Sequence, residues 1–170
     1  MPSRPPLSSA LGHKEMKVGL LSAKCGNCNQ VFSCPQLGDQ SYGQAIFRGE
    51  RGTVYAYFNA IDSTVFEYLR SVLPAQRKGD RLFATCAHLA DAIEGQRLST
   101  TIVCPHCSST NIAWWGGKIT GSCELPAASF SAFMSLSEPE RRKHASETFE
   151  AQLGASADGS GADSQRPANG

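Results

Sequence analysis

The sequence lacks both a long apolar run and a strong excess of charge. The 170-residue chain has no stretch near the roughly 20 apolar residues of a transmembrane helix, and its first 15 residues have no apolar core of a signal peptide. Sixteen lysine and arginine residues balance fifteen aspartate and glutamate residues, which gives a formal net charge of +1. We therefore expect no membrane span, a cytoplasmic location and no strong overall attraction for nucleic acid or anionic lipid.

Short motifs of enzyme active sites are also missing. The chain contains no phosphate-binding glycine loop, no nucleophile elbow and no His-Glu-x-x-His pair. His13-Lys14-Glu15 matches the first half of the zinc-deaminase signature, but Val103 stands where the second half requires proline, and the spacing is wrong. We therefore expect a binding module rather than an enzyme.

Cysteine is the residue that the chain has in unusual number. There are seven, and an odd number cannot pair completely within one chain. Cysteine pairs in a reducing compartment favour metal ligation over disulfides. Two C-x₂-C pairs, Cys25 with Cys28 and Cys104 with Cys107, would each form a knuckle that presents two thiolates to one cation. We predict that these four residues bind one structural Zn²⁺ ion, although iron accepts the same four sulfurs.

The distance between the two pairs is unusually long. Residues 29–103 separate them, whereas four-cysteine fingers usually space their pairs by about 15–20 residues. The longer loop costs only about 1.3 kcal/mol of additional closure entropy, because that cost grows logarithmically. Structural zinc binding contributes roughly 10–16 kcal/mol, so a folded insert between the pairs is compatible with one site.

The intervening segment contains its own secondary-structure patterns. Residues 44–58 alternate around a Gly49–Gly52 turn, which predicts a β-hairpin. Its inward side chains are expected to be Ile46, Val54, Ala56 and Phe58.

Three helices are expected after this hairpin. The first is capped by Asp62 or Ser63 and ends before Pro74. The second begins at Asp80 and is expected to have Gly95 as its C-terminal cap. The third begins with a capping box at Ser137 and runs towards Leu153. Its apolar face is thin, which predicts weak docking or a role in binding a partner.

The residues around the two cysteine pairs resemble the two half-sites of a zinc ribbon. Lys24 to Ser33 carries the first knuckle, and Val103 to Trp114 carries the second. The resemblance implies a four-cysteine structural zinc site in which each knuckle leads into a strand. For the second knuckle we expect a strand over 111–115, a Gly116–Gly117 turn and a return strand over 118–123. The segment between the knuckles matches no family that we recognise.

These patterns predict an α+β chain: a split zinc ribbon with an inserted β-hairpin and two-helix subdomain, followed by a C-terminal helix. The expected organisation is a disordered leader over 1–16, ribbon halves over 17–36 and 100–136, an insert over 37–99, a helix over 137–153 and a disordered tail over 154–170.

The three remaining cysteines receive different interpretations. Cys86 lies on the apolar stripe of its predicted helix and is expected to be a small buried hydrophobe. Cys34 follows Cys28 closely and is either an alternative ligand or the end of a strand. Cys123 is expected to be structural or a free thiol.

Two groups of residues are candidates for a binding surface. Tyr55 and Tyr57 are expected on the outward face of the hairpin near Arg48 and Arg51, a mixture that can stack bases and contact phosphates. Trp114 and Trp115 are adjacent on a predicted strand, so that one of them points away from the packed face. The alternative is that the insert covers these residues.

Three functions remain open at this point. A four-cysteine site is closed to substrate, so we expect a structural zinc ion in a non-enzymatic module. The near-neutral charge favours a protein partner over nucleic acid. The alternatives are a small enzyme with a pocket between the insert and the ribbon, and a redox switch in which oxidation releases zinc and forms disulfides within each pair.

Overall fold

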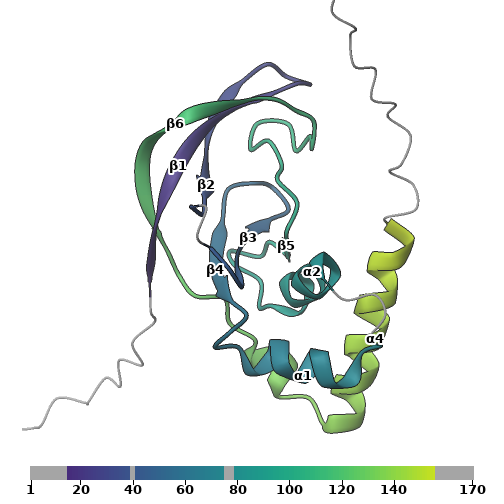
Figure 1. Ribbon diagram of the computed structural model, residues 1–170. Helices are drawn as coiled ribbons and strands as arrows, with labels where there is room; N and C mark the ends of the chain where they lie inside the picture. The colour runs from purple at the N-terminus through teal and green to yellow at the C-terminus, as the bar shows by residue number, and fades with distance from the viewer. Residues whose placement is uncertain (1–14, 39–40, 75–78, 156–170) are drawn as a thin grey trace, which may run out of the picture.

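Figure 1 shows the computed structural model, which describes residues 15–38, 41–74 and 79–155. The predicted leader over 1–16 and tail over 154–170 lie almost entirely outside the described residues. Within those residues the chain forms two small antiparallel sheets together with helices, so the expected α+β class is confirmed.

The first sheet, sheet A, joins strands from both ends of the described chain. It contains β1 (Met16–Cys25), β2 (Val31–Gln36) and β6 (Ile112–Leu125), in the order β2-β1-β6. β1 is the central strand and pairs antiparallel with both neighbours. Segments on either side of the long insertion therefore lie side by side (Figure 1).

The predicted turn at Gly116–Gly117 is wrong, because β6 continues through both glycines as a single strand. Leu21 pairs with Ile119 and Ala23 with Trp115, which leaves three residues of β6 opposite the single residue between Leu21 and Ala23. The long antiparallel partner offered by β1 keeps β6 extended. The glycines are accommodated in an irregular bulge instead of a hairpin turn.

The second sheet, sheet B, contains the predicted hairpin. β3 (Gln44–Gly49) pairs antiparallel with β4 (Tyr55–Asn59), and the short β5 (Leu98–Ser99) pairs with the other edge of β3. After β6 the chain crosses to this sheet, where Ala127 forms a parallel bridge with Tyr57. The hairpin prediction is confirmed.

The predicted inward face of this hairpin is wrong at Ile46. Ile46 pairs with Tyr57, whereas Phe47 pairs with Ala56, so Ile46 lies on the face opposite to Ala56 and Phe58. All five side chains are buried. Sheet B is covered on both faces, and alternation alone could not reveal this because an apolar residue then occupies both sides of the strand.

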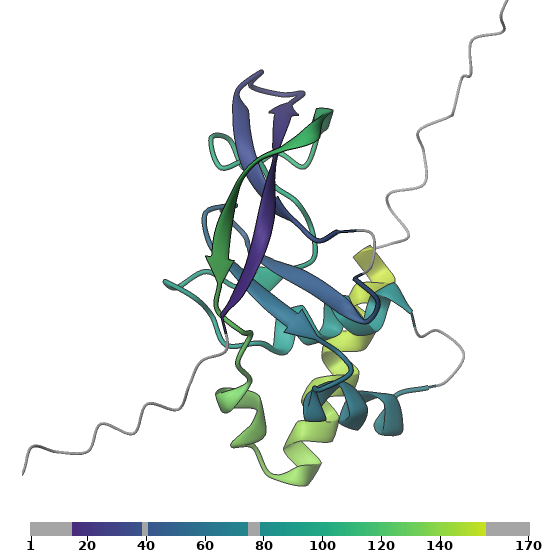
Figure 2. The same cartoon turned by 60° about the vertical axis from the view of Figure 1, so that its left-hand side comes forward.

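Helices cover one face of sheet B (Figures 1 and 2). They are α1 (Thr64–Val72), α2 (Asp80–Leu89), the single-turn α3 (Ser131–Met134) and α4 (Glu138–Ala155). Ser63 caps α1 by accepting a hydrogen bond from the Phe66 backbone N–H at 3.2 Å. Gly95 does not cap α2, because the helix ends at Leu89 and Gly95 lies in a tight turn closed by Ile93 and Gln96.

α4 is part of the main core. Ala145 and Phe149 are buried and pack with the residues of α1, α2 and sheet B. The expectation of weak docking is therefore wrong, although the side chain of Leu153 lies outside the described part. α4 contacts α2 directly.

The buried residues form three separate clusters that follow the layers. The largest lies between sheet B and the helices. A second lies between sheets A and B and contains Val18, Ile46, Tyr57 and Leu125. The third lies at the far end of sheet A, beneath the two cysteine pairs, and contains Ala23, Cys25, Phe32, Cys34 and Cys104. Among the described residues, no helix is long and apolar enough to cross a membrane.

Candidate metal centre

The first knuckle is the turn that joins β1 to β2. Cys25 is the last residue of β1, and Cys28 follows within the turn. The Cys25 backbone N–H donates to the Gln30 carbonyl at 3.0 Å, and the Asn29 N–H donates to the Cys25 carbonyl at 3.1 Å. Asn29 adopts a left-handed φ of 60°, which asparagine tolerates better than most residues. These backbone hydrogen bonds close the turn without any contribution from a ligand.

The second knuckle repeats this geometry between β5 and β6. The Cys104 N–H donates to the Ser109 carbonyl at 2.9 Å, and the Ser108 N–H donates to the Cys104 carbonyl at 2.8 Å. Ser108 has a φ of 57° at the position that Asn29 occupies in the first knuckle. The two C-x₂-C segments are thus locally equivalent, as the equal spacing of their cysteines suggested.

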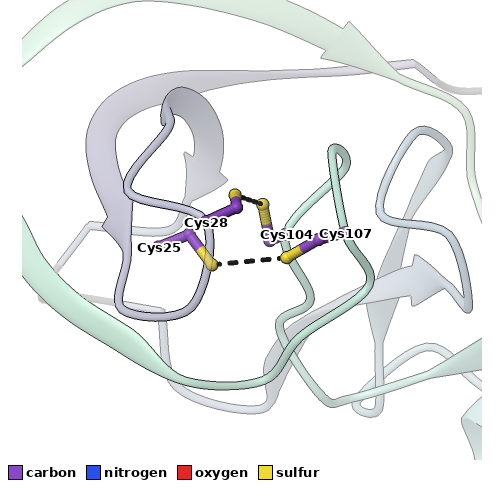
Figure 3. A group of neighbouring side chains, drawn as sticks. All are labelled: Cys25, Cys28, Cys104 and Cys107. Carbon is purple, nitrogen blue, oxygen red and sulfur yellow. Dashed lines mark hydrogen bonds between the residues drawn. The ribbon is translucent and has the colours of Figure 1, made fainter.

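The four sulfurs face one another across the gap between the knuckles (Figure 3). All four Sγ atoms lie within 4.8 Å of one another. Two of these contacts join the knuckles: Cys25 to Cys107 at 3.6 Å and Cys28 to Cys104 at 3.7 Å. A tetrahedral zinc site with Zn–S bonds of about 2.3 Å has S···S edges of about 3.8 Å, whereas a disulfide requires about 2.05 Å. The sulfurs are therefore spaced for a shared cation.

Backbone N–H groups point at these sulfurs. The Asn27 N–H lies 3.3 Å from the Cys25 sulfur. Hydrogen bonds from the Cys28 and Asn27 backbone lower the pKa of Cys25 against the opposing effect of burial. The backbone of Ser109 and the side chain of Asn27 lower the pKa of Cys107 to about 6. These donors favour the thiolate form, which is the form that binds a metal.

Cys28 has the opposite behaviour. The Gln30 N–H favours its thiolate, but desolvation and the three neighbouring cysteines outweigh that bond and raise the pKa of Cys28 to about 12. Four thiolates cannot crowd together without a cation, so some retain protons when Cys107 ionises. A divalent ion would remove that repulsion.

The burial of the sulfurs gives the centre an inner and an outer side. Cys25 and Cys104 are fully buried in the cluster at the end of sheet A. Cys28 and Cys107 lie nearer to solvent. His106, between the two cysteines of the second knuckle, is exposed.

The three other cysteines do not join this group of four. Cys34 lies on β2 and is buried in the cluster beneath the centre. Cys86 is buried in the main core, and burial raises its pKa to about 12. Cys123 lies on β6 between the two sheets. Cys34 therefore supports the centre by packing and does not contribute a ligand to the cluster.

Comparison with known proteins finds no relative of this chain. No model of a protein family, no curated protein and no solved structure matches it. A metal site at the four cysteines is therefore inferred from the positions of their sulfurs and from the two knuckles that hold them.

The predicted binding residues of the hairpin are mostly covered. Arg48 and Tyr57 are 8% and 7% exposed, so the expectation of an open face is wrong for both. Arg48 donates from Nη1 to the Ile46 carbonyl at 2.9 Å and from Nη2 to the Pro35 carbonyl at 3.3 Å. This guanidinium joins sheet B to sheet A and is not available to a ligand on the surface.

Tyr55 and Arg51 lie at the margin of the hairpin. Tyr55 is half-buried and donates its hydroxyl to the Gly52 carbonyl at 2.7 Å, and burial raises the pKa of Tyr55 to about 12. Arg51 is exposed, and its Nη2 donates to the Glu94 carbonyl at 3.4 Å.

Both tryptophans follow the second knuckle directly and remain accessible. Trp114 is 52% exposed and Trp115 is 37% exposed. Lys24 pairs with Trp114 on one side and with Val31 on the other, so these three residues form a row across one face of sheet A. Val31 is 57% exposed. Sequence alone could not identify this row, because its members come from three strands with a non-local register.

Two surface pockets lie away from the cysteines. One of about 480 Å³ lies between the end of β4, the start of α1 and residues 127–134. The other, of about 550 Å³, lies between α2, α3 and α4 and includes His88, His144 and Glu147. Neither pocket is lined by any of the four clustered cysteines.

Proposed function

We propose that this protein binds one zinc ion through Cys25, Cys28, Cys104 and Cys107. The observation that carries the proposal is the mutual approach of four sulfurs from two equivalent knuckles to within 4.8 Å. Sulfur ligands in tetrahedral array favour Zn²⁺ among common cellular cations, with iron as the competing occupant. The arrangement of both knuckles at one end of a three-stranded sheet supports the zinc-ribbon resemblance.

The ion is proposed to be structural and not catalytic. A catalytic zinc keeps a coordination position open for water or substrate, whereas four cysteine ligands fill a tetrahedral site. Two of the sulfurs belong to the buried cluster at the end of sheet A. Zinc would therefore hold the start of β6 against β1 and stabilise the surface formed there.

We assign to the module a binding role in which this zinc-braced surface contacts a protein. The row of Trp114, Lys24 and Val31 begins directly beside the knuckles and offers exposed apolar area around a single cation. Tryptophan is enriched among residues that contribute strongly to protein interfaces. The formal net charge of +1 gives little support to counterion-release binding of nucleic acid.

The test is recovery of partners from lysate of the native host with the wild-type chain and with Trp114→Ala. The matched control is Ile61→Ala, which removes another exposed apolar side chain, 69% accessible, far along the chain from the knuckles. We expect a specific protein to be retained by wild type and by the control and lost with Trp114→Ala. Recovery of nucleic acid with a steep salt dependence would indicate a nucleic-acid partner instead of a protein partner. If all three chains recover the same proteins equally, this surface is not the binding site.

A small enzyme is the second candidate. The pocket between α2, α3 and α4 favours it, because imidazole and carboxylate groups line a cavity of about 550 Å³. In such an enzyme the zinc ion would stabilise the fold and take no part in the reaction. Binding of small molecules that perturbs the NMR signals of His88 and His144 would support this function.

A further inference from the structure

Asn27 connects the two knuckles through its side chain. Its Nδ2 atom lies in the first knuckle and donates to the sulfur of Cys107 in the second at 3.6 Å, within the usual range for hydrogen bonds to sulfur. Its own backbone N–H donates to the Cys25 sulfur at 3.3 Å. One residue thus contacts two of the four sulfurs, one from each knuckle.

The backbone geometry of the turn does not by itself account for the bond from the Asn27 side chain to sulfur. The two knuckles have equivalent backbone bonds, and His106 occupies in the second knuckle the place that Asn27 occupies in the first. The His106 side chain is exposed, and within the described part of the chain no hydrogen bond joins it to a sulfur. Of these two equivalent knuckle positions, Asn27 is the one whose side chain donates to a sulfur of the cluster.

Cys107 is the sulfur for which such a bond matters most. Cys25 and Cys104 are shielded by the buried cluster, whereas Cys107 lies near solvent, where protons, oxidants and competing ligands have access. Four thiolates around a divalent ion leave the centre with excess negative charge. Donors that approach a metal-bound sulfur disperse this charge and lower its basicity and nucleophilicity.

We propose that Asn27 is a positioning residue that controls retention of the metal through its hydrogen bond to Cys107. This inference rests on the proposed zinc site and adds a determinant of its stability outside the four ligands. The amide holds the outermost sulfur in place and reduces its reactivity towards competing electrophiles. It also links the first knuckle to the second, between which the ion would be bound.

The test compares the wild-type chain with Asn27→Ala and Asn27→Asp, using His106→Ala as the matched control. Asn27→Asp retains the size of the side chain but replaces the donor by a carboxylate beside the thiolates. Each chain is loaded with Zn²⁺, and zinc affinity is measured by competition with a chromophoric chelator. We expect roughly a 10-fold loss with Asn27→Ala, a larger loss with Asn27→Asp and no change with His106→Ala.

Two further measurements separate this role from a general loss of fold. Among the four clustered cysteines, Cys107 should be alkylated first in the zinc-loaded Asn27→Ala chain, and faster than in wild type, as followed by peptide mass spectrometry. In the Co²⁺-substituted proteins, loss of the donor should shift the sulfur-to-cobalt charge-transfer band in both Asn27 variants and leave it unchanged in His106→Ala. A structural role alone would not move this band.

The outcomes distinguish the two levels of the proposal. A wild-type chain that binds no zinc would overturn the zinc site itself and with it the role of Asn27. Zinc binding by all four chains with equal affinity, equal Cys107 reactivity and identical cobalt spectra would overturn the role of Asn27 and leave the zinc site intact. A variant that fails to fold with excess zinc is replaced by Asn27→Ser, which is held to the same affinity and spectral criteria.

Discussion

Gly26 lies against the segment that leads from the second knuckle into β6. Its backbone N–H donates to the Asn111 carbonyl at 2.7 Å, and a Cβ atom added to Gly26 would lie 2.7 Å from the Asn111 side chain. Any larger residue must displace the Asn111 side chain from its place against the first knuckle. The spacing of the first C-x₂-C pair does not reveal this contact with a residue 85 positions away.

Gly26→Ala is therefore expected to destabilise the protein by about 1 kcal/mol and to weaken zinc binding slightly, because the added methyl group displaces the Asn111 side chain beside the first knuckle. Chemical denaturation and zinc competition measure the two effects. Gly117→Ala is the matched control, since an added Cβ there meets nothing within 4 Å. Asn111→Ala should restore part of the loss in the double variant, and no change in Gly26→Ala would show that the contact is not tight in solution.

The cluster of four cysteines was predictable from the sequence because C-x₂-C spacing is a local property with a specific geometric use. The burial of Arg48 and Tyr57 was not predictable from the sequence in this way. Their exposure depends on sheet A lying over sheet B, and that contact is formed by Val18 and Leu125 from distant segments. Local alternation identifies the two faces of a strand but does not say what covers each face.

At the scale of elements, β6 departs most from its prediction. The Gly116–Gly117 pair is typical of a turn, and a turn is what an isolated strand pair of this sequence would favour. In the structure this segment stays extended, because β1 pairs with β6 on both sides of the glycines. Helices with clear caps, such as α1 with Ser63 and α4 with Ser137, were predictable because their start signals lie within a few residues.

α4 is expected to contribute strongly to stability. Phe149 is 1% exposed within the main core, so Phe149→Ala should lower the free energy of unfolding by about 3–5 kcal/mol through loss of apolar contacts and creation of a cavity. Urea denaturation measures this loss. The neighbouring exposed residue provides the control as Glu150→Ala, which should be near neutral. Equal stability of both variants would mean that α4 does not belong to the core.

α3 is fixed to the end of α2 by a carboxylate. Asp91 accepts hydrogen bonds from the Ser129 hydroxyl at 2.8 Å and from the backbone N–H groups of Ser131 and Ala132 at 2.7 and 3.0 Å. Desolvation opposes the charge, but these three bonds outweigh it and hold the pKa of Asp91 below its ordinary value. A lowered pKa in the folded state stabilises the fold above the unfolded pKa, and the stabilisation is lost as the pH falls through the folded value.

Asp91→Asn should therefore cost about 1 kcal/mol at pH 7, a figure reduced for solvent exposure. The difference in stability between wild type and Asp91→Asn should persist down to about pH 4, near the ordinary aspartate pKa, and then vanish with further acidification. Urea denaturation from pH 7 to pH 3 measures it, with the exposed Glu124→Gln as control. A difference that grows on acidification would contradict the assigned role of this carboxylate.

At the scale of the whole molecule, the cysteine centre and the helical core are separate. The cluster beneath the knuckles contains none of the buried residues of the cluster between sheet B and the helices. Within the described part of the chain, no helix covers the outer face of sheet A (Figures 1 and 2), and the second knuckle precedes the start of β6. The zinc ion would therefore stabilise one end of the molecule and leave the other largely independent.

Removal of zinc by a chelator should loosen sheet A while the helical core persists. Hydrogen–deuterium exchange followed by mass spectrometry should show lost protection in β1, β2 and the first half of β6, with α2 and α4 protected as before. The fluorescence of Trp114 and Trp115 should change in the same titration. Uniform loss of protection would contradict the separation of the two cores, and unchanged protection throughout would contradict a structural role for the metal.

Native mass spectrometry of the chain purified from its own host tests the central claim most directly, because it reports the identity and number of bound metal ions. We predict one zinc ion per chain, retained in Cys34→Ser and Cys86→Ser and lost or strongly weakened in Cys25→Ser, Cys28→Ser, Cys104→Ser and Cys107→Ser. A metal-free wild-type chain that does not take up added zinc, or a chain whose zinc survives the loss of any two of these four cysteines, would contradict the proposed site.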